Sequence, residues 1–194
     1  MTTKQTQWKE PLVSLLVRRA RQGSRLVCFQ NGVGHVERLR NEGVPEERLF
    51  AAVTTEGAKR TSGNTVEHTG RGMTLIGGGN EGETAAEVLQ ELRSVFQSAG
   101  FEVRIVPDIE PYIWRKLIIN SVINPLTALL AIPNGRLIRS PDFLQVMRSL
   151  FEEATEAVGG FNAEEKRRLW EQLLDVCEKT AANHSSMLQD RTAG

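Results

Sequence analysis

The sequence has no surplus of charge of either sign, because 24 lysine and arginine residues are balanced by 24 aspartate and glutamate residues. Nucleic-acid-binding proteins usually carry a basic surplus, so the balance argues against a nucleic-acid partner. The sequence also lacks an uncharged apolar run of about 18 residues, so no membrane span is expected. The N-terminal residues MTTKQTQWKE lack the apolar core of a signal peptide. Together these absences make the cytoplasm the expected location.

Cysteine and histidine are scarce as well. Cys28 and Cys177 are the only cysteines, both stand in apolar contexts, and no CxxC pair suggests zinc. Two cysteines cannot stabilise a chain of this length through a disulfide framework, so a reducing compartment is expected. The histidines His35, His68 and His184 have no metal-ligand spacing, so each is interpreted as structural or solvent-facing and no metal is expected. Neither a Ser-His-Asp order nor a paired-carboxylate arrangement is present.

What the sequence does contain is, in its first part, an alternation of helix and strand patterns that predicts an α/β domain. Gly23 and Gly43 each follow a helical pattern, as glycines past a helix end do. The segment RLFAAVTTEGA is apolar without a period, which indicates a strand buried on both faces. The expected elements are a helix over 10–22, a strand in SRLVCFQ, a helix over 35–42, a strand in RLFAAVTTEGA, a hairpin in GNTVEHTGRGMTLIGGG, a helix over 83–99 and a strand in FEVRIVPDI.

After Pro107 the strand patterns end, and the remainder of the chain reads as all-α. Helices are expected over 109–131, 141–158 and 163–187. This change of character predicts a domain boundary near Pro107–Asp108, with an α/β domain over 1–107 and a helical domain over 108–194. The fold class is therefore α/β followed by all-α. Strands that would open a doubly wound sheet are missing, and the helical pattern stops at SSMLQDRTAG, so we expect both domains to be partial.

A polar stripe runs along the first helix of the second part. Lys116, Asn120 and Asn124 follow one another at intervals of four residues, which places them on one side of a helix whose other faces are apolar. A lysine is rarely buried without a partner, and unsatisfied amides are costly in apolar surroundings. The stripe is therefore expected to face a wet cleft or a polar ligand. The alternative is that Lys116 extends to solvent and the asparagines bond neighbouring backbone.

Two glycine-containing turns can be read in more than one way. Asn31-Gly32-Val33-Gly34 follows a strand and precedes a helix, the place where α/β sheets bind anionic ligands. On the sequence alone, a tight turn with Asn31 in a left-handed conformation is the stronger interpretation. Gly77-Gly78-Gly79 is interpreted as the end of a strand. Asn183, Ser185 and Ser186 lie late in the last helical stretch, where such residues usually mark fraying or capping.

Four segments, in this order, carry a family resemblance: QNGVG, WRKLIINSVINPLTAL, IPNG and NHSSMLQD. Together they resemble ketopantoate reductase (2-dehydropantoate 2-reductase), from about Lys4 to the end of the chain. The helix segment is specific, whereas NGVG alone is weak. The resemblance implies a Rossmann domain that binds NADPH and a helical C-terminal domain. It also implies reduction of 2-dehydropantoate to (R)-pantoate in pantothenate biosynthesis.

The resemblance assigns roles to residues that match the family segments. It implies that Lys116 is the catalytic proton donor. The matched cofactor contacts are Asn31, Ala58 in TTEGAKR and, on a shorter match, Lys4. The implied substrate-binding residues are Asn120, Asn124, Asn134, Asn183 and Ser186.

The family's opening strand, with its GxGxxG turn, has no counterpart here, and neither has a downstream segment that carries a glutamate. The resemblance therefore implies a partial chain that binds NADPH poorly or not at all by itself. Two alternatives stay open: a non-catalytic remnant that acts as a binding or interaction module, and a reductase of another 2-keto acid. The expected partners are a small-molecule substrate, with neither nucleic acid nor membrane, and a homodimer is left open.

Overall fold

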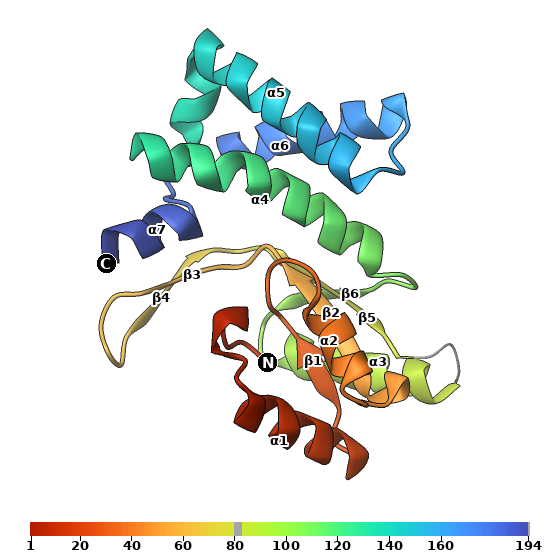
Figure 1. Ribbon diagram of the computed structural model, residues 1–194. Helices are drawn as coiled ribbons and strands as arrows, with labels where there is room; N and C mark the ends of the chain where they lie inside the picture. The colour runs from red at the N-terminus through yellow and green to blue at the C-terminus, as the bar shows by residue number, and fades with distance from the viewer. Residues whose placement is uncertain (80–82, 194) are drawn as a thin grey trace. The chain divides into compact units, whose positions relative to one another are not determined.

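The computed structural model describes residues 1–79 and 83–193. Two compact units make up the chain, Met1–Ile113 and Trp114–Gly194. The first unit is an α/β body around a sheet, and the second unit is helical, as the composition predicts (Figure 1). No helix among the described residues is both long and apolar enough to cross a membrane.

The first unit is built on a four-stranded sheet with the strand order β1-β2-β5-β6. The strand β2 is parallel to β1 and antiparallel to β5, and β5 is parallel to β6. Four consecutive residues of β2, Leu49–Ala52, are buried, which confirms the expectation of a strand covered on both faces. The strands are β1 (Leu26–Cys28), β2 (Leu49–Thr54), β5 (Met73–Gly78) and β6 (Glu102–Ile105).

The helices of this unit bury one stripe each. In α1 (Glu10–Arg21) the buried residues are Val13 and Ala20, whereas the apolar Leu15 is 39% exposed. In α3 (Glu83–Ser98) Val88 and Leu89 are buried, but Val95 is 59% exposed. The apolar periodicity predicted both helices, whereas tertiary packing determines which of their apolar residues are buried. The remaining helical elements are η1 (Gln5–Gln7), α2 (His35–Asn41) and η2 (Glu46–Arg48).

The expected hairpin over 63–79 is wrong in its partners. The strand β4 (Val66–Gly70) pairs antiparallel with β3 (Gly57–Arg60) in a separate two-stranded sheet, and β5 instead joins the main sheet. Residues 48–58, expected to form one strand, are divided between β2 and β3. Thr54 Oγ1 accepts from Thr74 Oγ1, and the N–H of Thr55 donates to the carbonyl of Met73, so the chain stays bonded to β5 until it enters β3. Alternation along β4 and β5 is local, so it could not reveal which neighbour each strand takes.

The N-terminal residues extend the sheet beyond β1. The Met1 ammonium donates to the carbonyl of Val27, and the N–H of Phe29 donates to the carbonyl of Met1 at 3.0 Å. Met1 thus bonds the residues on either side of Cys28, which is the hydrogen-bond pattern of parallel strands. Gln30 Nε2 also donates to the carbonyl of Thr3 at 3.0 Å. The first residues are thereby fixed beside the end of β1, where the Asn31–Gly34 turn begins.

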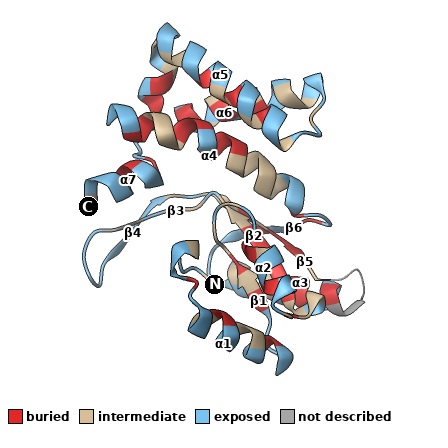
Figure 2. Cartoon of the chain, in the orientation of Figure 1, coloured by how far each residue is buried: buried red, intermediate tan, exposed pale blue. Residues whose placement is uncertain are grey.

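The second unit packs helices around one apolar core (Figure 2). Ile118, Ile119, Val122 and Ile123 bury one side of α4, and Met147, Phe151 and Leu173 from the following helices meet them. α4 remains one helix through Pro125, whose ring nitrogen cannot donate to the carbonyl of Ser121. The elements are α4 (Glu110–Leu130), η3 (Asn134–Arg139), α5 (Pro141–Val158), α6 (Ala163–Lys179) and α7 (Ser186–Ala193).

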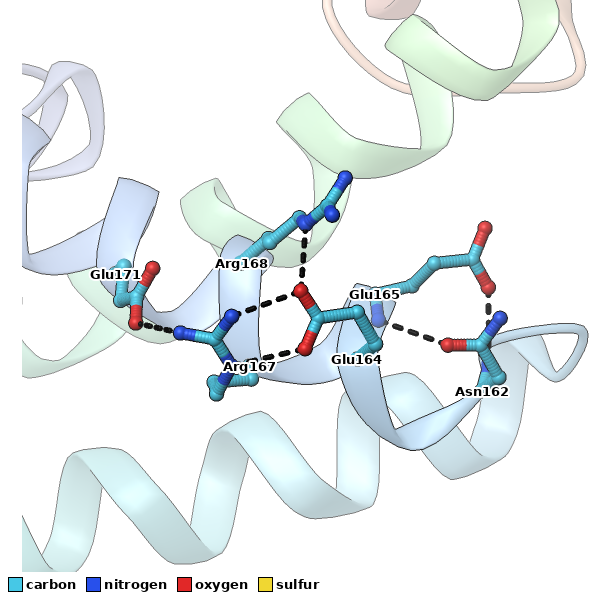
Figure 3. Close-up of polar contacts among 6 residues, drawn as sticks. All are labelled: Asn162, Glu164, Glu165, Arg167, Arg168 and Glu171. Carbon is cyan, nitrogen blue, oxygen red and sulfur yellow. Dashed lines mark hydrogen bonds and ion pairs between the residues drawn. The ribbon is translucent and has the colours of Figure 1, made fainter.

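Polar contacts define the start of α6 (Figure 3). Asn162 Oδ1 accepts from the N–H of Glu165, and Glu165 Oε2 accepts from the N–H of Asn162, both at 2.9 Å, which forms a capping box. On the exposed side, Glu164 bonds Arg167 and Arg168, and these bonds lower the pKa of its carboxyl to about 2. The capping box fixes where the helix begins, whereas the exposed ion pairs add little.

The expected helix over 163–187 is wrong in its last third. α6 ends at Lys179, and α7 begins only at Ser186. The Thr180 hydroxyl donates to the carbonyl of Val176 at 2.6 Å, and the following backbone turns to accept bonds from η3. Thr180-Ala181-Ala182 contains neither glycine nor proline, so no local signal marks the break. Contacts distant in sequence end the helix.

Candidate functional site

The polar stripe on α4 is present in the structure. Lys116, Asn120 and Asn124 lie on one uninterrupted helix, all three are half-buried, and their spacing places them on one side of it. The side chains of Asn120 and Asn124 form no hydrogen bond with residues 1–79 or 83–193. The opposite side of the helix is occupied by the apolar core. The amide groups are therefore held on a packed support with their bonding capacity unused.

Lys116 differs from an ordinary surface lysine in its acidity. Burial lowers the pKa of its ammonium from 10.5 to about 8, because the charged form loses hydration. The group is mostly protonated at neutral pH and can still release a proton with little cost. A general acid works best when its pKa lies near the operating pH, and this ammonium meets that condition.

Asn134 is held in place by the end of α6. It is 8% exposed, its Nδ2 donates to Thr180 Oγ1 at 2.9 Å, and its N–H donates to the carbonyl of Asn183 at 3.0 Å. Its Oδ1 is buried and has no hydrogen-bond partner among the described residues. A buried acceptor without a donor is costly, so a ligand hydroxyl or amide would be favourable here.

Gly135 allows the IPNG segment to lie in close contact with Ala181. A Cβ at this position would lie 2.5 Å from Ala181 Cβ and 2.8 Å from Ala181 Cα. The N–H of Gly135 donates to the carbonyl of Ala181 at 3.1 Å. The glycine therefore permits the backbone contact that ends α6 and positions Asn134.

Asn183, Ser185 and Ser186 could be recognised in the sequence, but the buried contact between Thr127 and Ser185 could not. The Thr127 hydroxyl donates to Ser185 Oγ at 2.7 Å, and Ser185 Oγ accepts from the N–H of Leu188 at 3.2 Å, which caps α7. Ser186 and Asn183 are exposed. Of two adjacent serines, the first is structural and the second presents its side chain outward. The contact with the buried Thr127, which lies 58 residues from Ser185 in the chain, distinguishes the two serines.

In the first unit, Asn31 and Lys4 lie at the same end of β1. Gln5 Nε2 donates to the carbonyl of Asn31 at 2.7 Å and lies 3.0 Å from His35 Nδ1. These two contacts hold Gln5, the residue after Lys4, against the Asn31–Gly34 turn. Both Lys4 and Asn31 are exposed. The left-handed residues of this turn are Gly32 and Gly34, so the expectation of a left-handed Asn31 is wrong. Glycine adopts that conformation without a Cβ clash, and asparagine is not needed for it.

A buried acceptor lies next to this turn. Gln30 Oε1 has no hydrogen-bond partner among the described residues, although Gln30 Nε2 is bonded to Thr3. The group immediately precedes Asn31 at the carboxyl end of β1, where open α/β sheets bind ligands. Ala58 is exposed on β3 in the separate two-stranded sheet, and no bond links it to Asn31 or Lys4. The structure therefore brings Lys4 and Asn31 to one turn, and Ala58 belongs to a different element.

The glycines at the end of β5 serve packing. Gly77, Gly79 and Gly82 have the spacing GxGxxG between β5 and α3, although residues 80–82 lie outside the described part. A Cβ at Gly77 would lie 2.9 Å from the carbonyl oxygen of Val106, and one at Gly79 would lie 2.9 Å from Phe50 Cε1. The space beside these two glycines is occupied by Val106 and Phe50 of the same unit. This agrees with the expectation that Gly77–Gly79 ends a strand.

Comparison with protein families gives two matches that cover most of the chain. Residues 1–81 match the family described as "Ketopantoate reductase PanE/ApbA", and residues 108–194 match "Ketopantoate reductase PanE/ApbA C terminal". The 2-dehydropantoate 2-reductase of Bacillus subtilis (strain 168) is 33% identical over 197 residues, which is 100% of this chain and 62% of that protein. The chain thus spans about six-tenths of the length of this relative.

Solved structures agree with this result. The crystal structure of a probable 2-dehydropantoate 2-reductase from Bacillus subtilis superposes with a TM-score of 0.75 at 32% identity, covering 97% of this chain and 62% of that one. A D-mandelate dehydrogenase in complex with NADH has a TM-score of 0.85 at 20% identity, covering 99% of this chain and 64% of that one. The second likeness shows a shared fold only.

Proposed function

This chain belongs to the ketopantoate reductase family, and we propose that it serves the NADPH-dependent reduction of the 2-keto group of 2-dehydropantoate to (R)-pantoate. The observation that carries the proposal is the half-buried Lys116, with a pKa lowered to about 8, on the same side of α4 as Asn120 and Asn124. Under this proposal the product enters pantothenate biosynthesis, and Lys116 is the proton donor.

Lys116 would act on the carbonyl oxygen of the substrate. When bound, a reduced nicotinamide would supply the hydride for the C2 carbon, and negative charge would then grow on the attached oxygen. The ammonium of Lys116 hydrogen-bonds that oxygen, stabilises the charge and gives up one proton, so that an alcohol and a neutral amine result. The lowered pKa reduces the cost of that transfer, because the neutral amine is the form that burial favours.

The amide side chains would orient the substrate without adding a competing charge. Asn120 and Asn124 can each donate to a carboxylate or accept from a hydroxyl. Asn134 offers a buried Oδ1 that has no partner among the described residues, which fits a substrate hydroxyl, and Asn183 is bonded to Asn134 through the backbone. Ser186 follows three residues later at the start of α7. A helix and a packed loop are rigid supports, as catalysis requires.

Lys4, Asn31 and Ala58 are proposed as contacts of the dinucleotide. The fit rests on the Gln30 Oε1 acceptor and on the Gly32–Gly34 turn at the carboxyl end of β1, where backbone groups are accessible to a polar ligand. Lys4 adds a positive charge beside this turn, which suits a phosphate group.

The ionisation of Lys116 provides a test of substrate binding that does not depend on turnover. We expect 2-dehydropantoate to raise the Lys116 pKa, because a bound carboxylate favours the charged ammonium. The measurement is a pH titration of the labelled lysine by NMR, with and without substrate. N120A and N124A should weaken the effect, and L129A, at an exposed position on the same helix, is the matched control. An unchanged Lys116 pKa at saturating substrate contradicts the proposed site.

Turnover is tested separately by following NADPH oxidation. K116A should lower kcat by about 100-fold or more, the usual contribution of a general acid. The wild-type rate should fall as the pH rises through about 8, because the proton donor is lost. A K116A rate close to wild type would remove the proposed acid. If a 2-keto acid without the hydroxyl group of 2-dehydropantoate were reduced faster than 2-dehydropantoate, that acid would be the better candidate for the substrate.

A further inference from the structure

The strand β6 forms one edge of the main sheet, and among the described residues only β5 pairs with it. The N–H of Val106 donates to the carbonyl of Ile76 in β5 at 3.0 Å. Because backbone groups alternate along a strand, Glu102 and Arg104 direct theirs toward β5 in the same way. Val103 and Ile105 therefore direct their N–H and carbonyl groups away from the sheet. A groove of about 470 Å³ runs along this edge, lined by Glu102–Ile105 and by Gln90, Arg93 and Gln97 of α3.

The two faces of β6 have opposite character. Glu102 and Arg104 are exposed on one face, and neither forms an ion pair with a described residue. On the other face Val103 is buried and Ile105 is half-buried against α3. Phe101 belongs to this second face, because its ring lies 6.4 Å from that of Phe96, and it is still 39% exposed. An open edge with one charged and one apolar face is complementary to a strand of matching pattern.

A second copy of β6 supplies such a strand, and its register is constrained. In an antiparallel pair, residues with outward backbone groups must lie opposite one another. Centring the pair on Glu102 or on Arg104 would place like charges directly opposite, which is destabilising. Centring it on Ile105 would require a donor at Pro107, which has no N–H. Centring it on Val103 places Glu102 opposite Arg104 of the second copy, and Arg104 opposite Glu102 of the second copy.

We propose that two copies of this chain associate through β6, antiparallel, about a two-fold axis at Val103. Val103 exchanges both backbone hydrogen bonds with its counterpart, and the charged pairs lie at non-hydrogen-bonded positions, where side chains are closest. On the α3 face, Ile105 contacts Phe101 of the second copy and covers its exposed ring. The interface is isologous, so each contact occurs twice. Because the contact is short, we expect the dimer to be weak and to dissociate on dilution.

Charge reversal tests the register directly. The full chain is followed by sedimentation velocity across the micromolar range, where the wild type should show a monomer–dimer equilibrium. Glu102→Arg places two arginines opposite each other, and Arg104→Glu places two glutamates opposite each other, so each variant should be monomeric. A mixture of the two variants should recover a heterodimer, because every arginine of one then faces a glutamate of the other. The double variant Glu102→Arg/Arg104→Glu should dimerise like the wild type.

Glu156→Arg on α5 is the matched control, since it makes the same charge change at an exposed position of the other unit. It should leave the dissociation constant unchanged. Circular dichroism should show that all variants fold, as expected for exposed positions. A wild-type chain that stays monomeric at its solubility limit would overturn the proposal. So would a dimer that persists in both single variants, or a mixture that fails to form heterodimers.

Discussion

The hydroxyl of Thr127 donates a 2.7 Å hydrogen bond to the hydroxyl of Ser185, and both residues are buried. The bond connects the last turn of α4 to the start of α7. Ser185→Ala removes this acceptor and the cap of α7 together, so we expect the free energy of unfolding to fall by about 1 to 3 kcal/mol. Urea unfolding measures the change. Ser186→Ala, at the exposed neighbour, should be nearly neutral, and equal losses in the two variants would contradict the assignment.

Gly135 provides a steric prediction. Gly135→Ala would bring a methyl group to 2.5 Å from Ala181 Cβ, so the loop must shift, and a destabilisation of about 1 to 3 kcal/mol is expected. A Cβ at Gly63 would meet nothing within 4 Å, and Gly63→Ala should be neutral or slightly stabilising. Thermal unfolding of both variants compares them. If the shift displaces Asn134, Gly135→Ala should also weaken substrate binding.

Lys116 makes stability depend on pH. Its folded-state pKa of about 8 lies below the unfolded value of 10.5, so the unfolded chain binds the proton more tightly. The cost of the buried charge is present in full below pH 8 and disappears as the pH rises toward the unfolded value, so stability should rise over that interval. The expected gain is about 3 to 3.5 kcal/mol, because the shift is about 2.5 pKa units and each unit corresponds to about 1.4 kcal/mol.

Lys116→Met isolates this effect, since other groups also titrate in that range. The difference in unfolding free energy between Lys116→Met and wild type should be largest near pH 7 and should shrink by pH 10. Urea unfolding at several pH values measures it. A difference that is constant with pH would show that the Lys116 pKa is not lowered.

The capping box of α6 should matter more than the ion pairs beside it. Asn162→Ala removes the acceptor for the Glu165 N–H and should lower the free energy of unfolding by about 1 kcal/mol. Glu164→Gln, which breaks only exposed ion pairs, should have a smaller effect that declines with added salt. Chemical unfolding at low and high ionic strength distinguishes the two. A larger loss for Glu164→Gln would contradict this ranking.

Much of the architecture could be predicted because its signals are local. The helices around Lys116 and Met147 follow from apolar periodicity, and the buried strand around Ala51 follows from an apolar run without a period. Each segment carries its signal by itself. The end of α6 could not be predicted, because Ala181 and Ala182 favour helix, and the contacts of Ala181 with Gly135 and of Asn183 with Asn134 come from a distant segment. The partner of β4 was missed for the same reason, since alternation does not specify which strand is the neighbour.

The sequence by itself determined the α/β and helical halves, the one-sided polar stripe at Lys116, Asn120 and Asn124, and the family resemblance. These depend on residue type and spacing along a single element, which the chain encodes directly. Only the tertiary structure decided that Ser185 rather than Ser186 is buried, that Asn134 Oδ1 has no partner among the described residues, and that burial lowers the pKa of Lys116. The physical reason is that burial, and the hydration and bonding that change with it, depends on segments far apart in the sequence.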